Sequence, residues 1–189
     1  MAKYDPSALK VRLAPLPPLA LIALTAACAE RANPVYEKYW VGDHLREVRE
    51  AIDVAWALLA GTTPDPARLK KLDSIVRDHV EFLNEEGITI LASSATVSLR
   101  VLECIIAKED QKLSAKRAIG STLYVAQLAA KFSKTMDEAI ATDEEVTWHN
   151  RAIDLVEKGP GPWNSDSFRQ LGDDPPKWWQ AYEAGSQHI

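Results

Sequence analysis

The sequence predicts an all-α protein, a single bundle of six or seven helices with a short C-terminal helical appendix. Apolar residues recur at helical spacing along nearly the whole chain, and strand-like alternation persists nowhere. Of the 189 residues, 27 are Ala, the strongest helix former, whereas Gly and Pro number only 8 and 11. Asp, Gly and Pro also stand where the apolar pattern starts and stops, as expected at helix ends.

Two helices are expected in the first 40 residues. A short one covers 7–13. A longer one starts at the two prolines of 17–18, because proline in the first turn of a helix removes no helical hydrogen bond. It runs to about Arg31, since Pro34 is expected to end it. Residues 35–40 then form a short aromatic segment.

The apolar run 19–29 shares features with a lipoprotein signal, since basic residues precede it and Cys28 follows small residues. However, Asp5 lies in the would-be basic region, and Thr25 stands where a large aliphatic residue is expected. The run is also shorter than the ~20 residues that a membrane span requires. We therefore interpret it as a buried helix of a cytoplasmic protein that does not associate with membranes.

Two amphipathic helices follow. The first begins near Asp43 and ends at Gly61, and the second begins at Asp65-Pro66 and ends at Gly87. Each places its apolar residues on one face, as a helix on the surface of a bundle does: Leu45, Val48, Ile52, Ala55, Trp56 and Leu59 in the first, and Leu69, Leu72, Val76, Val80 and Leu83 in the second.

The next segment, 88–107, is apolar on nearly all sides, which predicts a central helix covered by several neighbours. A long Ala-rich helix is expected over 112–141. Thr142 and Glu145 have the spacing of a capping box, so another helix is expected to begin there. That helix ends at Gly159.

Residues 159–162 form the clearest break in the chain. They divide the chain into a helical bundle, 1–158, and an acidic, Trp-rich helical appendix, 159–189, which packs on or beside the bundle. Within the appendix we expect a short helix at 167–171 and a terminal helix at 175–184.

The net charge of −5 at pH 7 is unevenly distributed. The first 40 residues carry a net charge of +2, residues 41–134 carry 0, and residues 135–189 carry −7. This balance argues against a nucleic-acid binder, which needs a basic face to neutralise phosphates. An acidic end with four of the six Trp fits a basic protein partner. The alternative is a solvated acidic end whose Trp residues pack onto the core.

On the first interpretation, the candidate partner interface combines acidic and aromatic residues of the C-terminal quarter. Its members are Asp143, Glu144, Trp163, Asp173, Asp174, Trp178, Tyr182 and Glu183.

The chain contains no phosphate-binding loop, dinucleotide fingerprint, nucleophile elbow or zinc-protease motif. Glu145 and His149 could share a metal, but a capping Glu beside a half-buried His is the favoured interpretation. His79, between acidic neighbours, is expected on a solvated surface. Cys28 and Cys104 are expected to be buried and inert. We therefore expect no catalytic residue, no cofactor and no metal, and interpret the chain as a protein other than an enzyme.

One stretch carries a family resemblance. It begins with Cys28-Ala29-Glu30-Arg31-Ala32-Asn33-Pro34-Val35-Tyr36-Glu37 and continues with Gly42-Asp43, Arg46, Arg49, Ala51-Ile52, Ala55-Trp56 and Leu59-Ala60-Gly61. The pattern resembles the start of an all-α family of immunity proteins from bacterial polymorphic toxin loci, the Imm-5-like group. It is also similar to the YjaG-like bacterial family of unknown function. The resemblance covers about residues 16–61, and the Trp-rich tail matches neither family.

The immunity resemblance implies inhibition by binding, in which the protein occludes or distorts one cognate toxin domain inside the producing cell. An acidic bundle suits a basic toxin. The shared residues are expected to serve packing and turns. Glu30 and Arg31 could form an internal ion pair, a functional pair or surface charge, and their place before Pro34 favours a structural role. The alternative function is a non-enzymatic signalling or regulatory helical adaptor, including a homodimeric one whose aromatic tail forms the dimer surface.

Overall fold

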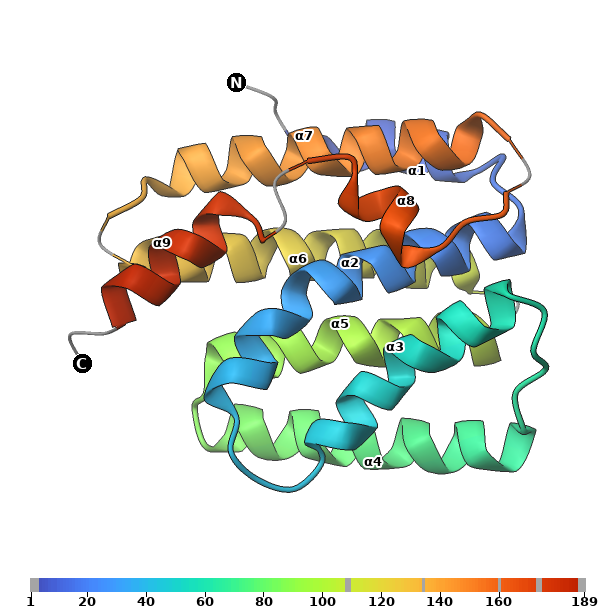
Figure 1. Cartoon of the computed structure of the whole chain (residues 1–189), viewed down its shortest axis with the longest axis horizontal. Coiled ribbons are helices and arrows are strands. Elements are labelled where there is room, and N and C mark those ends of the chain that lie inside the picture. The colour runs from blue at the N-terminus through green and yellow to red at the C-terminus, as the bar shows by residue number, and fades with distance from the viewer. Residues whose placement is uncertain (1–3, 108–109, 134, 160, 173–174, 187–189) are drawn as a thin grey trace.

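The computed structural model describes residues 4–107, 110–133, 135–159, 161–172 and 175–186. Within these ranges the chain is all-α, with nine helices and no strand (Figure 1). The helices are α1 (Pro6–Leu13), α2 (Pro18–Tyr39), α3 (Leu45–Leu59), α4 (Pro66–Glu85), α5 (Thr89–Ile106), α6 (Gln111–Ser133), α7 (Glu138–Glu157), α8 (Ser165–Arg169) and α9 (Lys177–Ser186). The predicted fold class is confirmed.

Helix α5 is the centre of the lower part of the bundle in Figure 1, where it packs against α2, α3, α4 and α6. Most of its apolar residues, from Ile90 to Cys104, are buried by these neighbours, which confirms the predicted central helix. Among the helices described, α5 alone is long and apolar enough to cross a membrane by length and composition, and 67% of it is buried inside the bundle.

Helix α2 continues through Pro34 to Tyr39, so the prediction that Pro34 ends the helix was wrong. Proline removes one helical hydrogen bond, but packing can hold the chain helical beyond it. Val35 and Tyr36 are both fully buried after the proline. Just before it, the Ser94 hydroxyl of α5 donates a hydrogen bond of 2.8 Å to the Ala32 carbonyl. The helix changes direction toward α4 over its last turns (Figure 1).

The predicted boundary between α6 and α7 was also wrong. Helix α6 ends at Ser133, and α7 begins at Glu138, where the Asp137 carboxylate accepts a hydrogen bond of 2.7 Å from the Ala139 amide. Thr142 therefore lies inside α7, and its hydroxyl donates to the carbonyl of Glu138 at 2.7 Å. An Asp is as good an N-cap as a Thr, so the cap five residues earlier takes the place of the predicted capping box.

Helix α9 packs across α6, while α8 lies against α2 (Figure 1). The approach of α9 to α6 is very close at Gly185, where a Cβ atom would lie 2.5 Å from the carbonyl oxygen of Ser133. In this way the described part of the C-terminal segment covers one side of the bundle.

Candidate functional site

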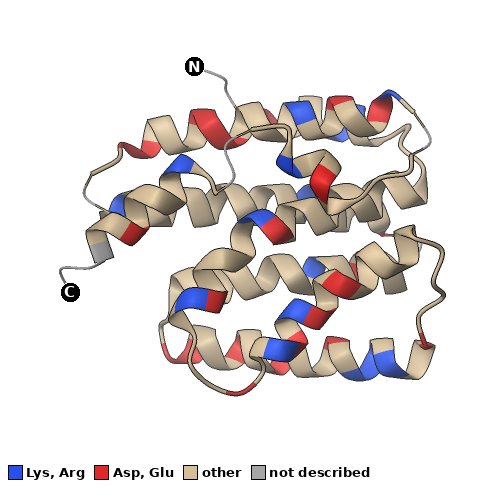
Figure 2. Ribbon diagram, viewed as in Figure 1, with Lys and Arg blue, Asp and Glu red and all other residues tan. Residues whose placement is uncertain are grey.

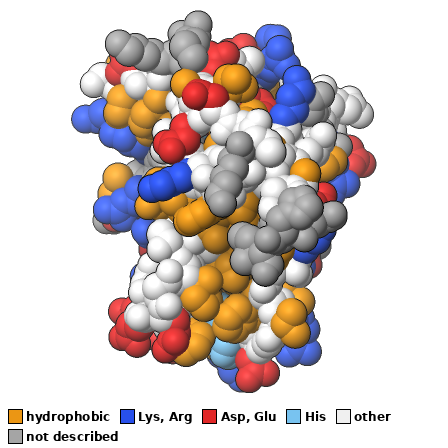
Figure 3. Space-filling model, turned by 90° about the vertical axis from the view of Figure 1, so that its left-hand side faces the viewer, with side chains coloured by type: hydrophobic (Ala, Val, Ile, Leu, Met, Phe, Trp, Pro, Cys, Tyr) orange, Lys and Arg blue, Asp and Glu red, His pale blue; other side chains and the backbone are white. Residues whose placement is uncertain are grey.

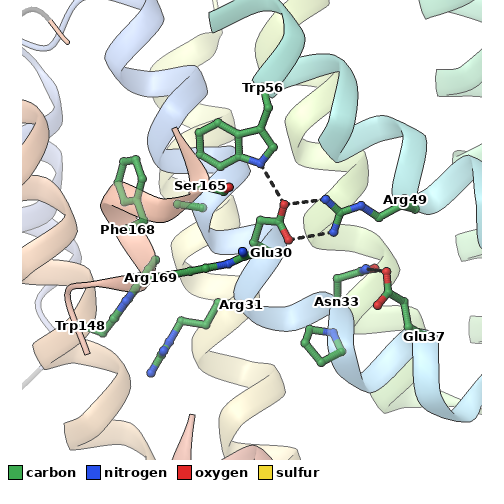
Figure 4. A pocket seen from close by; sticks show the side chains of 12 residues that line it. Glu30, Arg31, Asn33, Glu37, Arg49, Trp56, Trp148, Ser165, Phe168 and Arg169 are labelled. Carbon is green, nitrogen blue, oxygen red and sulfur yellow. Dashed lines mark hydrogen bonds and ion pairs between the residues drawn. The ribbon is translucent and has the colours of Figure 1, made fainter. Parts of the chain in front are cut away.

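Glu30 and Arg31 are neighbours in α2, but each pairs with a different part of the molecule. The Glu30 carboxylate accepts hydrogen bonds of 2.7 and 2.8 Å from the Arg49 guanidinium and one of 3.0 Å from the Trp56 indole, both on α3 (Figure 4). Arg49 also pairs with Asp53 at 2.8 Å. The hydrogen bonds from Arg49 to Glu30 raise the pKa of Arg49, which fixes its positive charge.

Arg31 points instead to the buried carboxylate of Glu145 on α7. The distance from Arg31 Nε to Glu145 Oε2 is 2.9 Å, and the Trp178 indole of α9 donates to the same oxygen at 2.9 Å. The Arg31 guanidinium also lies 4.8 Å from the ring centroid of Trp148. Glu145 therefore joins α2, α7 and α9 through one buried carboxylate. The interpretation of Glu145 as a capping residue was wrong, because it is 0% exposed in the middle of α7.

A cleft of about 180 Å³ is lined by residues of both clusters (Figure 4). Its lining combines charged, polar and aromatic side chains: Glu30, Arg31, Asn33 and Glu37 from α2, Arg49 and Trp56 from α3, Trp148 from α7, and Ser165, Phe168 and Arg169 from α8. The side-chain amide oxygen of Asn33 (Oδ1) is buried and has no hydrogen-bond partner among the described residues. These groups can hold a small polar molecule or an inserted side chain by hydrogen bonds and ring contacts.

Both cysteines are buried, as expected. Burial raises the pKa of the Cys28 thiol and raises that of Cys104 to about 11. The thiolate is the reactive form, so both side chains are unreactive thiols near neutral pH.

His149 is 3% exposed, so it is buried rather than half-buried as predicted. Burial lowers its pKa to about 4, although the nearby Glu145 carboxylate acts in the opposite direction. Its Nε2 atom lies 3.4 Å from Glu145 Oε1. Among the described residues, no group of three or more His, Cys, Asp or Glu is arranged to hold a metal ion.

The predicted solvated position of His79 was wrong. It is 3% exposed, and its Nε2 lies 2.6 Å from the hydroxyl of Tyr36. Burial, together with the nearby His44, lowers the pKa of His79. The ring packs among those of Trp40 and Phe82, so His79 belongs to an aromatic cluster between α2 and α4.

Two members of the predicted partner interface are core residues. Trp163 and Trp178 are 8% and 0% exposed, so neither can contact a partner in this conformation. Their burial corrects the prediction and agrees with its alternative, in which Trp residues pack onto the core. The indole of Trp178 donates a hydrogen bond to Glu145, which lies far from it in the sequence.

The remaining described members lie at or near the surface. Asp143 and Glu144 are partly exposed on α7, and Glu144 accepts a hydrogen bond of 3.0 Å from the backbone amide of Lys177. Tyr182 is partly exposed beside Tyr39, and Glu183 forms an ion pair with Lys38. Asp173 and Asp174 lie outside the described residues.

Sequence reasoning missed an aromatic surface at the C-terminal end of α2, where Tyr39 contacts α9 and Trp40 contacts α4. We call it the aromatic end surface and define it by Tyr39, Trp40, Val41, Phe82 and Tyr182. The signal in the sequence was the aromatic segment 35–40. It was insufficient, because Phe82 and Tyr182 come from helices that meet α2 only in the folded chain.

Comparison of the chain with known protein families, with curated proteins and with solved structures gave no match.

Proposed function

We propose that this chain is a non-enzymatic binding protein that neutralises a cognate antibacterial toxin domain by direct protein–protein contact in the cytoplasm of the producing cell. The toxin domain is basic on this proposal, and the complex requires no cofactor, metal, nucleic acid or membrane.

The acidic face of α7 is the observation that carries the proposal. This helix holds six Asp and Glu and one Arg (Figure 2). Glu145 is buried against Arg31 and two other carboxylates pair with Arg12, so the acidic face lies in the N-terminal half of the helix, at Glu138, Asp143 and Glu144. Asp143 and Glu144 are partly exposed, and the apolar side chain of Ile140 beside them is 55% exposed. An acidic face attracts a basic partner over long range and accelerates its association.

The charged residues of the motif at 28–61 serve the fold of the proposed binding protein. Glu30, Arg31 and Arg49 are paired within the chain, where they hold α2 to α3 and α7. Their contribution is thus to the shape of the bundle, which leaves contact with a partner to other surface side chains.

The homodimeric form of the adaptor alternative loses its support in the tail. A homodimer through the Trp-rich tail required exposed Trp residues, but Trp163, Trp178 and Trp179 are all buried. Light scattering at high protein concentration checks this point, and a stable dimer would favour the alternative.

The test is co-expression with the toxin domain encoded by the adjacent gene. We expect cells to survive and the two proteins to co-purify. The double variant Asp143→Asn with Glu144→Gln removes two of the negative charges of α7. It should slow the association with the toxin domain and make the association rate less dependent on salt concentration. Cell death without any complex would overturn the proposed function.

A further inference from the structure

The aromatic end surface is visible on the end of the molecule that faces the viewer in Figure 3. Its rings pack in two pairs at the end of α2: the centroids of Tyr39 and Tyr182 are 5.2 Å apart, and those of Trp40 and Phe82 are 6.2 Å apart. Below them, the ring of Trp40 lies 6.3 Å from that of the buried Tyr36. The surface is therefore continuous with the core of the bundle.

Part of this apolar surface is exposed to solvent. Val41 is 95% exposed and Phe82 is 45% exposed, and Val41 is the most exposed large apolar side chain of the described residues. Exposed apolar side chains that gather in one place, rather than lying singly, mark interaction sites. Aromatic rings are also the side chains that contribute most to the binding energy of interfaces.

The loop that carries Val41 has a fixed shape. The Trp40 indole donates a hydrogen bond of 2.7 Å to the carbonyl of Asp43. It also packs so closely on Gly42 that a Cβ atom there would lie 3.1 Å from the ring. His44 closes the loop in the left-handed conformation, with φ of 72°. A pre-formed contact loop loses little conformational freedom when it binds, which favours affinity.

Carboxylates flank the aromatic end surface on the side of α4, within a helical turn of Phe82. Asp78, Glu81, Glu85 and Glu86 lie in the second half and C-cap of α4, and no Lys or Arg occurs from 78 to 99. In the described chain the ion pairs of α4 use Arg68, Asp73 and Arg77, in its first part. The nearby cations are already paired, Lys38 with Glu183 and Arg46 with Glu47. This edge of the surface is therefore acidic.

From these contacts we propose that the aromatic end surface docks a basic segment of the toxin domain that carries apolar anchor residues. The inference rests on the proposed function and names the contact that holds the complex together, whereas the acidic face of α7 speeds its formation. Complementary charge selects this occupant over a second copy of the chain, because two copies would bring their acidic edges together and repel.

Dissociation kinetics with the toxin domain of the adjacent gene test the proposal. Val41→Ser combined with Phe82→Ser should raise the dissociation rate by about tenfold or more and leave the association rate nearly unchanged. The matched control is Val11→Ser combined with Leu19→Ser, two similarly exposed apolar residues, 73% and 49%, on α1 and the start of α2. The control should bind as the unmodified chain does.

A second variant separates an effect on binding from a loss of folding. Val41→Ser alone changes a side chain that makes almost no contact with the fold, and it should still raise the dissociation rate. Equal dissociation rates for this variant, the double variant and the control would overturn the inference but leave the proposed function standing. A complete lack of complex with the unmodified chain would overturn both. A dimer of the chain that Val41→Ser disrupts would identify a second copy as the occupant and also overturn the inference.

Discussion

At the residue scale, the Arg31–Glu145 pair is almost fully removed from water, with 6% and 0% of the two side chains exposed. Ions lose several kcal/mol of hydration when they are buried, so each depends on its partner. Glu145 also accepts the indole hydrogen bond of Trp178. The pair therefore fixes α9 as well as α2 and α7.

Glu145→Leu is expected to lower the free energy of unfolding by about 3–5 kcal/mol, because it leaves the Arg31 charge buried without its main partner. The double variant Arg31→Met with Glu145→Leu should recover much of this loss, since it removes both charges. Urea denaturation of the two variants measures the difference. Equal stability of the single and double variants would show that the pair is not the source of the effect.

His149 predicts a dependence of stability on pH. Its pKa is about 4 in the folded chain, well below the ordinary value of about 6.5 expected after unfolding. As the pH falls from about 6.5 to 4, the unfolded chain takes up a proton that the folded chain excludes, so stability decreases. The difference between the two pKa values corresponds to about 3 kcal/mol.

The variant His149→Leu isolates this contribution. Between pH 7 and pH 4, the unmodified chain should lose about 3 kcal/mol more stability than the variant, as measured by urea denaturation at each pH. Parallel stability curves for the two proteins would mean that His149 is protonated equally in the folded and unfolded chains.

At the element scale, α4 has an unusual charge order. Cations stabilise the C-terminal end of a helix, but α4 ends with Glu85 and its C-cap Glu86, with no basic residue in the last turn. Replacing Glu85 by Lys should therefore raise the free energy of unfolding by about 0.3–1 kcal/mol. Thermal denaturation measures this gain, with Glu81→Gln, an exposed carboxylate one turn earlier in α4, as the control. A loss of stability would mean that Glu85 serves the fold rather than a surface function.

Helix α9 depends on its close approach to α6. Gly185→Ala is expected to lower the free energy of unfolding by about 1–3 kcal/mol, since the new Cβ atom would lie 2.5 Å from the Ser133 carbonyl oxygen. Gly159→Ala is the matched control, because nothing lies within 4 Å of its Cβ position. If hydrogen exchange found α9 equally protected in both variants, the packing of α9 on α6 would not depend on this glycine.

Helices could be predicted where local signals agree. The central position of α5 follows from its apolar residues on all sides, and the start of α4 follows from Asp65, whose carboxylate caps the helix at Ala67. The predicted helix boundaries were wrong where tertiary packing or a different capping residue determines the end of the helix. Pro34 stays inside α2 because both sides of it are buried, and Asp137 replaces Thr142 as the cap of α7.

At the scale of the whole molecule, the site was harder to predict than the fold. The sequence shows which segments carry the negative charge. The burial of Trp178, however, depends on its hydrogen bond to Glu145. The aromatic end surface depends on contacts that α2 makes with α4 and with α9. Such contacts join residues far apart in the sequence. Local spacing carries no signal for them, so the predicted partner interface included the buried Trp163 and Trp178 and left out the exposed Val41 and Phe82.

The most direct measurement is a calorimetric titration of the toxin domain encoded by the adjacent gene into the full chain. Neutralisation by contact predicts a one-to-one complex whose affinity falls as salt is added, since the acidic surface attracts a basic partner. It also predicts a negative change in heat capacity from burial of the aromatic end surface. An absence of binding at low salt, with the toxin domain folded and active, would contradict the proposed function.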